Sequence, residues 1–304
     1  MSNMNKLIFA TRPSKLARWQ TNHVISLLKE HWQVLICDEI VITTKGDKAI
    51  DQPLQEIGDK GLFTLELEEA LRSGRVDAAV HSLKDLPTEE TDRLIISAVS
   101  IRAPANEVLI CPRGYTLDEL PEGAVVGTSS LRRQSQLLAY RPDINVRAIR
   151  GNVDTRIRKV QEGQYDAVIL AAAGVTRLGL NDHITQHIPL DIMLPAPGQG
   201  ALAVQCRADD ENTLQLLSIV EDTSTRLAVT AERSFLSELG GGCAIPVGAY
   251  AQVKGDEITM QAIVASVDGR QKMHLSERHT DPKILGMIMA QKALALGAQE
   301  VLHV

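Results

Sequence analysis

The chain has 304 residues, of which 44% are hydrophobic, 23% charged and 3% aromatic, and its formal net charge at pH 7 is −6. This length predicts about two domains with substantial cores, and the composition excludes disorder, collagen and coiled coil as the main structure. The low aromatic content and the negative charge argue against a protein designed overall to bind nucleic acid or an anionic membrane.

The sequence contains no candidate for a membrane segment. The longest apolar run near the N-terminus covers residues 7–10, which is shorter than a signal peptide needs, and no later stretch approaches the roughly 20 apolar residues that span a bilayer. The four cysteines are scattered without a C-x-x-C pair, and the eight histidines lack metal-binding spacings. We therefore expect a cytoplasmic protein with free thiols and no bound metal.

Short β-branched runs alternate with helical patterns through most of the chain, which predicts an α/β fold with largely parallel sheets. Ser14 is a suitable N-cap for the first helix, because its hydroxyl can accept a hydrogen bond from an N–H group of the first turn. In chain order, we expect a strand at residues 6–10, a helix from Ser14, a strand at 34–43, a helix at 62–73 and a buried strand at 76–80.

Two short segments of the chain resemble each other. Residues 74–80 read Gly-Arg-Val-Asp-Ala-Ala-Val, residues 163–169 read Gly-Gln-Tyr-Asp-Ala-Val-Ile, and each follows a predicted helix that ends in glycine. Two similar lobes are one interpretation, although any two glycine-terminated helices that lead into strands could match as well.

The pattern changes after Asp222. Strands are grouped there between two helices without βαβ alternation, which predicts a small C-terminal α+β domain. The expected elements are one long amphipathic helix, a run of three glycines at 240–242, strands near 244–253, 257–264 and 272–278, and a helix at 281–296.

Positive charge is concentrated in one stretch of this acidic chain, where seven arginines lie between Thr128 and Arg158 against two aspartates. Segment 128–133, Thr-Ser-Ser-Leu-Arg-Arg, is expected where a strand turns into a helix, and free N–H groups, hydroxyls and the helix dipole attract an anion there. Each of these arginines, taken alone, is better explained as a solvent-exposed residue on a helix surface. Jointly, Arg12, Lys84, Arg132 and Arg150 indicate an anion site, because all four lie at predicted C-terminal ends of strands, where open α/β sheets bind ligands. The neighbouring basic and hydroxyl residues are Ser14, Ser130, Arg133 and Arg156.

The chemistry of this anion stays open at this point, because a guanidinium fork fits carboxylate and phosphate equally. The chain has no G-x-x-x-x-G-K-[ST] motif, and no G-x-G-x-x-G opens a helix, so a nucleotide is not specifically indicated. A polycarboxylate is at least as good an expectation as a phosphate.

Two further residues are candidates for chemistry. Asp85 follows Lys84 at the end of a predicted buried strand, where a carboxylate could stabilise charge or transfer a proton, although it could also cap the turn before Pro87. Cys243 follows three glycines on a predicted loop, where a thiolate could attack an electrophile. The alternative for Cys243 is an incidental cysteine in a linker.

Seven segments together resemble the hydroxymethylbilane synthases, also called porphobilinogen deaminases. They occur in the family's order over essentially the whole chain. They are 11–17 (Thr-Arg-Pro-Ser-Lys-Leu-Ala), 60–63 (Lys-Gly-Leu-Phe), 80–85 (Val-His-Ser-Leu-Lys-Asp), 127–133 (Gly-Thr-Ser-Ser-Leu-Arg-Arg), 150–152 (Arg-Gly-Asn), 195–200 (Pro-Ala-Pro-Gly-Gln-Gly) and 241–243 (Gly-Gly-Cys).

The resemblance implies an enzyme of tetrapyrrole and haem synthesis that joins four porphobilinogen molecules head to tail and releases ammonia and linear hydroxymethylbilane. It implies a dipyrromethane cofactor bound through a thioether to Cys243, and a catalytic Asp85 that stabilises a cationic intermediate and directs proton transfer. The implied cofactor-binding residues are Cys243, Lys84, Asp85, Thr128, Ser130, Arg132, Arg133 and Asn152, and the implied substrate-binding residues are Arg12, Ser14, Lys60, Arg150 and Arg156.

The fold implied by the resemblance has two lobes like those of type II periplasmic binding proteins and a third domain. Lobe one would cover residues 1–101 with a return segment at 201–219, lobe two residues 102–200, and a C-terminal cofactor-attachment domain residues 222–304. The resemblance further implies a cytoplasmic monomer that binds porphobilinogen and neither nucleic acid nor membranes.

Two other functions remain as alternatives: a non-catalytic anion-binding module with two lobes, and an enzyme acting on phosphate esters.

Several positions depart from the family's pattern, and they bear on substrate binding and interdomain contacts. The departures are Glu56 where many relatives have lysine, Pro13 and Pro197 where proline is unusual, Ala-Pro-Ala-Asn at 103–106 in place of Asp-Pro-Arg-Asp, and Gly240 where an acid is common.

Overall fold

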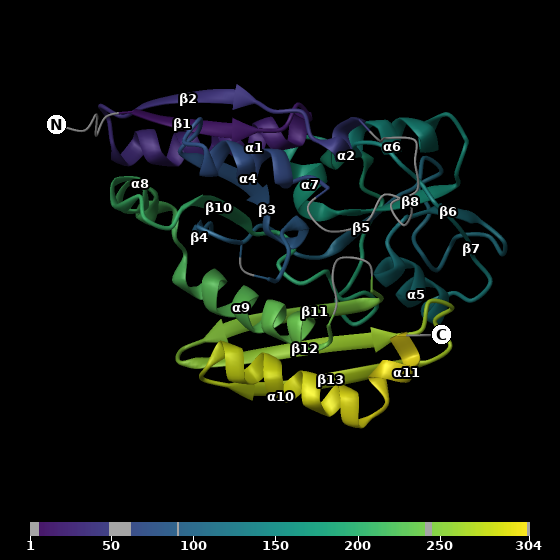
Figure 1. The fold of residues 1–304 in the computed structure, drawn as a ribbon. Coiled ribbons are helices and arrows are strands. Elements are labelled where there is room, and N and C mark those ends of the chain that lie inside the picture. Colours follow the sequence, from purple (N-terminus) through teal and green to yellow (C-terminus); the bar gives the residue numbers. More distant parts are fainter. Residues whose placement is uncertain (1–5, 49–61, 90, 241–244, 303–304) are drawn as a thin grey trace. The chain divides into compact units, whose positions relative to one another are not determined.

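The computed structural model describes residues 6–48, 62–89, 91–240 and 245–302 (Figure 1). The chain divides into two compact units, the first made of Met1–Arg102 and Ala201–Arg226, the second of Ala103–Gly200 and Leu227–Val304. Among the described residues, no helix combines the length and the apolar character needed to cross a bilayer.

The first unit is built on a five-stranded sheet with the order β2-β1-β3-β10-β4. Strand β1 pairs in parallel with β2 and β3, whereas β10 runs antiparallel to both β3 and β4. The strands are β1 (Lys6–Thr11), β2 (Ile36–Val41), β3 (Ala78–Ser82), β4 (Leu94–Val99) and β10 (Leu202–Arg207), and the helices are α1 (Lys15–His31), α2 (Lys45–Lys48), α4 (Leu65–Arg72), η1 (Leu83–Asp85), α8 (Glu211–Leu217) and η3 (Ser218–Val220).

Alternate residues of each strand point to opposite faces of this sheet, and a helix packs on each face. Phe9 packs in one cluster with Leu28 of α1, whereas Ala10 packs in another with Leu67 of α4. Ser14 is the N-cap of α1, as predicted, and its hydroxyl oxygen accepts a hydrogen bond of 3.2 Å from the Ala17 N–H group.

The second unit contains a five-stranded sheet with the order β7-β6-β8-β5-β9. Strand β6 pairs in parallel with β7 and β8, whereas β5 runs antiparallel to β8 and β9. The strands are β5 (Glu107–Ile110), β6 (Val125–Gly127), β7 (Asn145–Arg147), β8 (Ala167–Ala171) and β9 (Gln186–His187), and the helices are α5 (Leu131–Tyr140), α6 (Val153–Gln161), α7 (Ala172–Arg177) and η2 (Asn181–His183).

The two five-stranded sheets share one topology: the first three strands of each order pair in parallel, and the fourth strand runs antiparallel to both of its neighbours. The similar segments 74–80 and 163–169 lead into β3 and β8, which occupy the same place in their sheets. The prediction of an α/β fold is confirmed, but the prediction of largely parallel sheets is wrong. Each sheet is mixed because it includes a strand, β10 or β5, that enters from the opposite direction.

The second unit also contains a three-stranded antiparallel meander near the C-terminus, green to yellow in Figure 1. Its inward-facing side chains share one core with Phe235, Leu285 and Met289 from the flanking helices, which confirms the predicted α+β pattern. The elements are α9 (Thr223–Glu238), which begins in the first unit, β11 (Val247–Lys254), β12 (Glu257–Ala265), β13 (Lys272–His279), α10 (Pro282–Ala295) and α11 (Ala298–Leu302).

Candidate active site

Lys84 and Asp85 lie in the short helix η1, directly after β3 in the first unit. Leu83 and Leu86 on either side are buried, and the Leu83 N–H group donates to the Ala201 carbonyl at 3.1 Å, which fixes the turn. Asp85 itself is exposed, and its carboxylate makes no hydrogen bond to any residue that the structure describes. It therefore does not cap the turn, and it is available to a ligand.

The turn between β6 and α5 holds Thr128 and Ser130 in the second unit. The Thr128 hydroxyl accepts from the Ser130 N–H group at 3.2 Å, and Ser130 is the N-cap of α5, accepting from the Arg133 N–H group at 3.4 Å. Ser129 fixes the turn, because its hydroxyl donates to the Ile149 carbonyl at 2.8 Å and accepts from the Ile149 N–H group at 3.1 Å. The predicted strand-to-helix turn is thus present.

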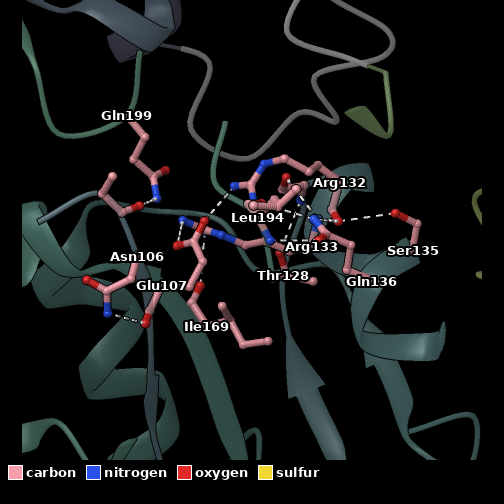
Figure 2. Close-up of polar contacts among 12 residues, drawn as sticks. Asn106, Glu107, Thr128, Arg132, Arg133, Ser135, Gln136, Ile169, Leu194 and Gln199 are labelled. Atoms are coloured by element: carbon pink, nitrogen blue, oxygen red, sulfur yellow. Dashed lines mark hydrogen bonds and ion pairs between the residues drawn. The ribbon is translucent and has the colours of Figure 1, made fainter. Parts of the chain in front are cut away.

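Arg132 and Arg133 in the first turn of α5 share one buried carboxylate, that of Glu107 in β5 (Figure 2). Arg132 Nη2 lies 2.6 Å from Glu107 Oε1, and Arg133 Nη2 lies 2.7 Å from Glu107 Oε2. The Nη1 atoms donate to the carbonyls of Leu194 at 2.8 Å and Ile169 at 3.0 Å. Glu107 was not among the predicted site residues, although an acid at the start of an apolar run was a signal for it.

This buried cluster carries two positive charges against one negative charge. The exposed fractions of the side chains are 5% for Arg132, 8% for Arg133 and 0% for Glu107. Burial lowers the pKa of Arg132 from its ordinary value, and although the Glu107 carboxylate opposes this shift, the like charge of Arg133 adds to it. Arg133 Nε is buried and has no hydrogen-bond partner in the described part of the chain. The cluster therefore suits one further anionic ligand.

Arg150, Asn152 and Arg156 lie at the start of α6. Gly151 has a φ of +113°, and a Cβ at this position would lie 2.7 Å from Thr155 Cγ2, so glycine is required for the turn. Arg156 Nε donates to the Gly151 carbonyl at 2.7 Å. Asn152 occupies the N-cap position, but its exposed side chain makes no capping hydrogen bond, which leaves its amide for a ligand.

Arg12 follows β1 in the first unit and forms an ion pair with Asp47. Arg12 Nη2 lies 2.5 Å from Asp47 Oδ1, and Arg12 Nε lies 3.2 Å from Asp47 Oδ2. Ser14 uses its hydroxyl oxygen as the cap of α1. Asp47 was not among the predicted site residues, because it follows β2 without an apolar pattern around it.

Three residues of the sequence analysis, Glu56, Lys60 and Cys243, lie outside the described residues. Of the described cysteines, Cys111 and Cys206 are buried and Cys37 is half-buried. Burial raises the pKa of Cys37 and of Cys206, which disfavours their thiolates. Among the described cysteines, these two are therefore poor candidates for a covalent link.

Comparison with known proteins gives two family models that together match most of the chain. "Porphobilinogen deaminase, dipyromethane cofactor binding domain" matches residues 7–215, and "Porphobilinogen deaminase, C-terminal domain" matches residues 226–295. A porphobilinogen deaminase from Brevibacillus brevis is 52% identical over 300 residues, which is 98% of this chain and 97% of the relative. Another from Roseiflexus castenholzii is 47% identical, covering 98% and 99%. Among solved structures, the Bordetella pertussis BvgS VFT2 domain is 18% identical, covers 77% of this chain and 94% of its own, and has a TM-score of 0.44.

Proposed function

The chain belongs to the porphobilinogen deaminase family, and from this premise we propose that it joins four porphobilinogen molecules into linear hydroxymethylbilane and releases ammonia. The observation that carries this function is the match over nearly the full length, both to the family models and to relatives about half identical in sequence. An anion-binding module without catalysis is not favoured, because the relatives are named as enzymes.

The family's cofactor domain binds dipyrromethane, and the buried arginine cluster fits such a group. When bound, dipyrromethane supplies the covalent primer to which pyrrole units are added, and it carries acetate and propionate side chains. One net positive charge supports a carboxylate beside Arg132 and Arg133, as does Arg133 Nε, which has no hydrogen-bond partner among the described residues. The proposed cofactor-binding residues are Cys243, as the thioether ligand, with Lys84, Asp85, Thr128, Ser130, Arg132, Arg133 and Asn152.

Asp85 is the proposed catalytic residue. Its exposed carboxylate on a turn fixed by Leu83 and Leu86 can accept hydrogen bonds from pyrrole N–H groups and stabilise positive charge that develops on the reacting ring. It can also hold the proton that the ring gives up or takes back. Lys84 beside it binds a carboxylate of the cofactor.

The incoming porphobilinogen carries two carboxylates, which need basic or hydrogen-bond-donating partners. We assign them to Arg12, Ser14, Lys60, Arg150 and Arg156. The two lobes with their return segment at 201–219, and the C-terminal domain from residue 222, are proposed as the three domains of the enzyme. A net charge of −6 and four scattered cysteines support a cytoplasmic monomer without nucleic-acid or membrane partners.

The intact mass of the purified protein tests this proposal. We expect a covalent increment of two pyrrole units in the wild type and none in Cys243→Ala, together with consumption of porphobilinogen and release of ammonia by the wild type only. A wild-type protein of unmodified mass that ignores porphobilinogen would refute the function. A Cys243→Ala protein that keeps the increment would refute only the attachment site.

A further inference from the structure

The guanidinium of Arg12 is bound along one edge only. Asp47 accepts hydrogen bonds from Arg12 Nη2 at 2.5 Å and from Arg12 Nε at 3.2 Å. A guanidinium has five N–H donors, and the ion pair with Asp47 uses two of them, one on Nε and one on Nη2. Among the described residues, no hydrogen-bond partner takes the opposite edge, which Nη1 and the second Nη2 hydrogen form.

Asp47 is itself held in place by Thr44. The Thr44 N–H group donates to Asp47 Oδ2 at 3.1 Å, and the Thr44 hydroxyl donates to the same oxygen at 2.8 Å. Burial works to raise the pKa of Asp47, but the hydrogen bonds from Arg12 and Thr44 outweigh it, so this pKa lies below its ordinary value. Asp47 is therefore a fixed, ionised carboxylate with a side chain that is 10% exposed.

The face of the Arg12 guanidinium is covered by Phe63. Arg12 Cζ lies 4.2 Å from the centroid of the ring, a distance at which a cation is attracted to an aromatic face. The ring in turn packs on Gly46, because a Cβ on this glycine would lie 2.1 Å from Phe63 Cε1. The Gly46 N–H group donates to the Leu62 carbonyl at 3.0 Å, which holds the two segments together. Arg12 is thus fixed along one edge and over one face.

We propose that Asp47 is a positioning residue for porphobilinogen: it holds Arg12 by its Nε edge, so that the Nη1/Nη2 fork receives a carboxylate of the substrate. This inference rests on the proposed function and on Arg12 as a substrate ligand. A carboxylate that competed with substrate would occupy the fork itself, whereas Asp47 occupies the other edge and keeps its bonds to Thr44. A pre-oriented guanidinium loses less side-chain freedom when the ligand binds.

The test compares Asp47→Asn with wild-type holoenzyme. The amide keeps the shape but loses the charge, and it can accept from only one of the two Arg12 nitrogens. We expect the KM for porphobilinogen to rise about tenfold, with kcat within about twofold and a normal cofactor mass. In an Arg12→Lys background, which has no Nε edge, the same substitution should change KM by less than about twofold.

Asp38→Asn is the matched control. It breaks the ion pair of Lys6 and Asp38, which joins β1 to β2 in the same sheet through side chains that are 45% and 55% exposed. We expect no change in KM from it. A second variant, Thr44→Val, removes one donor to Asp47 but leaves the pair with Arg12, and it should raise KM about threefold.

The KM values of these variants decide whether Asp47 positions Arg12 for the substrate. An unchanged KM in Asp47→Asn overturns the proposal, and a lowered KM would make Asp47 a competitor of the substrate instead. If Asp47→Asn does not fold, an unchanged KM in Thr44→Val overturns the proposal as well. A wild-type enzyme that does not consume porphobilinogen refutes the proposed function, which is a different result from any of these.

Discussion

Replacing Glu107 with Gln probes the buried arginine pair most directly. Glu107 is fully buried and accepts from Arg132 at 2.6 Å and from Arg133 at 2.7 Å. The glutamine keeps the shape of the side chain, but its NH2 group faces one of the guanidinium donors. Removing one partner of a buried ion pair costs about 3–5 kcal/mol, because the remaining charges stay buried without compensation. We expect a loss of this size in the free energy of unfolding of the cofactor-free protein.

The cofactor-bound form of the same variant should lose less stability. If carboxylates of dipyrromethane pair with Arg132 and Arg133, they supply part of the negative charge that Glu107→Gln removes. A hydrogen bond to a charged group contributes about 1.5–3 kcal/mol. The difference in unfolding free energy between cofactor-bound and cofactor-free protein should therefore be larger in Glu107→Gln than in the wild type, by about 1.5–3 kcal/mol.

Urea unfolding of four proteins measures this difference: the wild type and Glu107→Gln, each with and without Cys243→Ala to prevent cofactor attachment. Glu232→Gln is the matched control, because Glu232 is also fully buried but accepts from the N–H groups of Gly198 and Ala251, both at 2.7 Å. It should lower stability equally in both forms. If the difference in unfolding free energy between cofactor-bound and cofactor-free protein is the same in Glu107→Gln and in the wild type, the arginine pair is not a cofactor site.

Two further predictions concern Asp85 in η1 and the packing around Gly269 in the second unit. Asp85→Asn should keep the cofactor mass but lower turnover by at least ~10²-fold, the scale of losing a positioned acid–base group; turnover near that of the wild type would contradict the role of Asp85. Gly269→Ala should lower the unfolding free energy by about 2–4 kcal/mol, because its φ is +72° and its Cβ would lie 2.5 Å from Ser135 O. Gly255→Ala, with φ +59° and open space around it, should lose only about 1–2 kcal/mol for the backbone strain, and equal losses in both would contradict the packing argument.

The parts of the site that follow from local chemistry were predictable from the sequence. Ser14 and Ser130 cap helices because a hydroxyl at the start of an amphipathic pattern satisfies a free N–H group. The position of Lys84 and Asp85 directly after a buried strand was also predictable, because the polar residues there mark the end of the apolar run. These features depend on neighbours within a few residues, so that one sequence is enough to find them.

The partners of the arginines were not predictable, because they come from distant segments. Glu107 reaches Arg132 across 25 residues and Arg133 across 26, and only the position of β5 in the sheet brings them together. Asp47 lies 35 residues from Arg12 for a similar reason. Strand order and direction are also non-local, which is why the mixed sheets were expected to be largely parallel.

The buried histidine of β3 gives a prediction about pH. His81 is 6% exposed, and burial, together with the positive charge of Arg12, lowers its pKa to about 4. The unfolded chain binds a proton near the ordinary value of about 6.5, whereas the folded protein binds it only near 4, so stability is lost as the pH falls through this interval. Between pH 7 and pH 5 this single group should remove about 2 kcal/mol from the free energy of unfolding. In His81→Gln that contribution disappears, so the variant should lose about 2 kcal/mol less than the wild type over the same interval in urea unfolding. Equal losses in the two proteins would show that His81 does not stay neutral in the folded state.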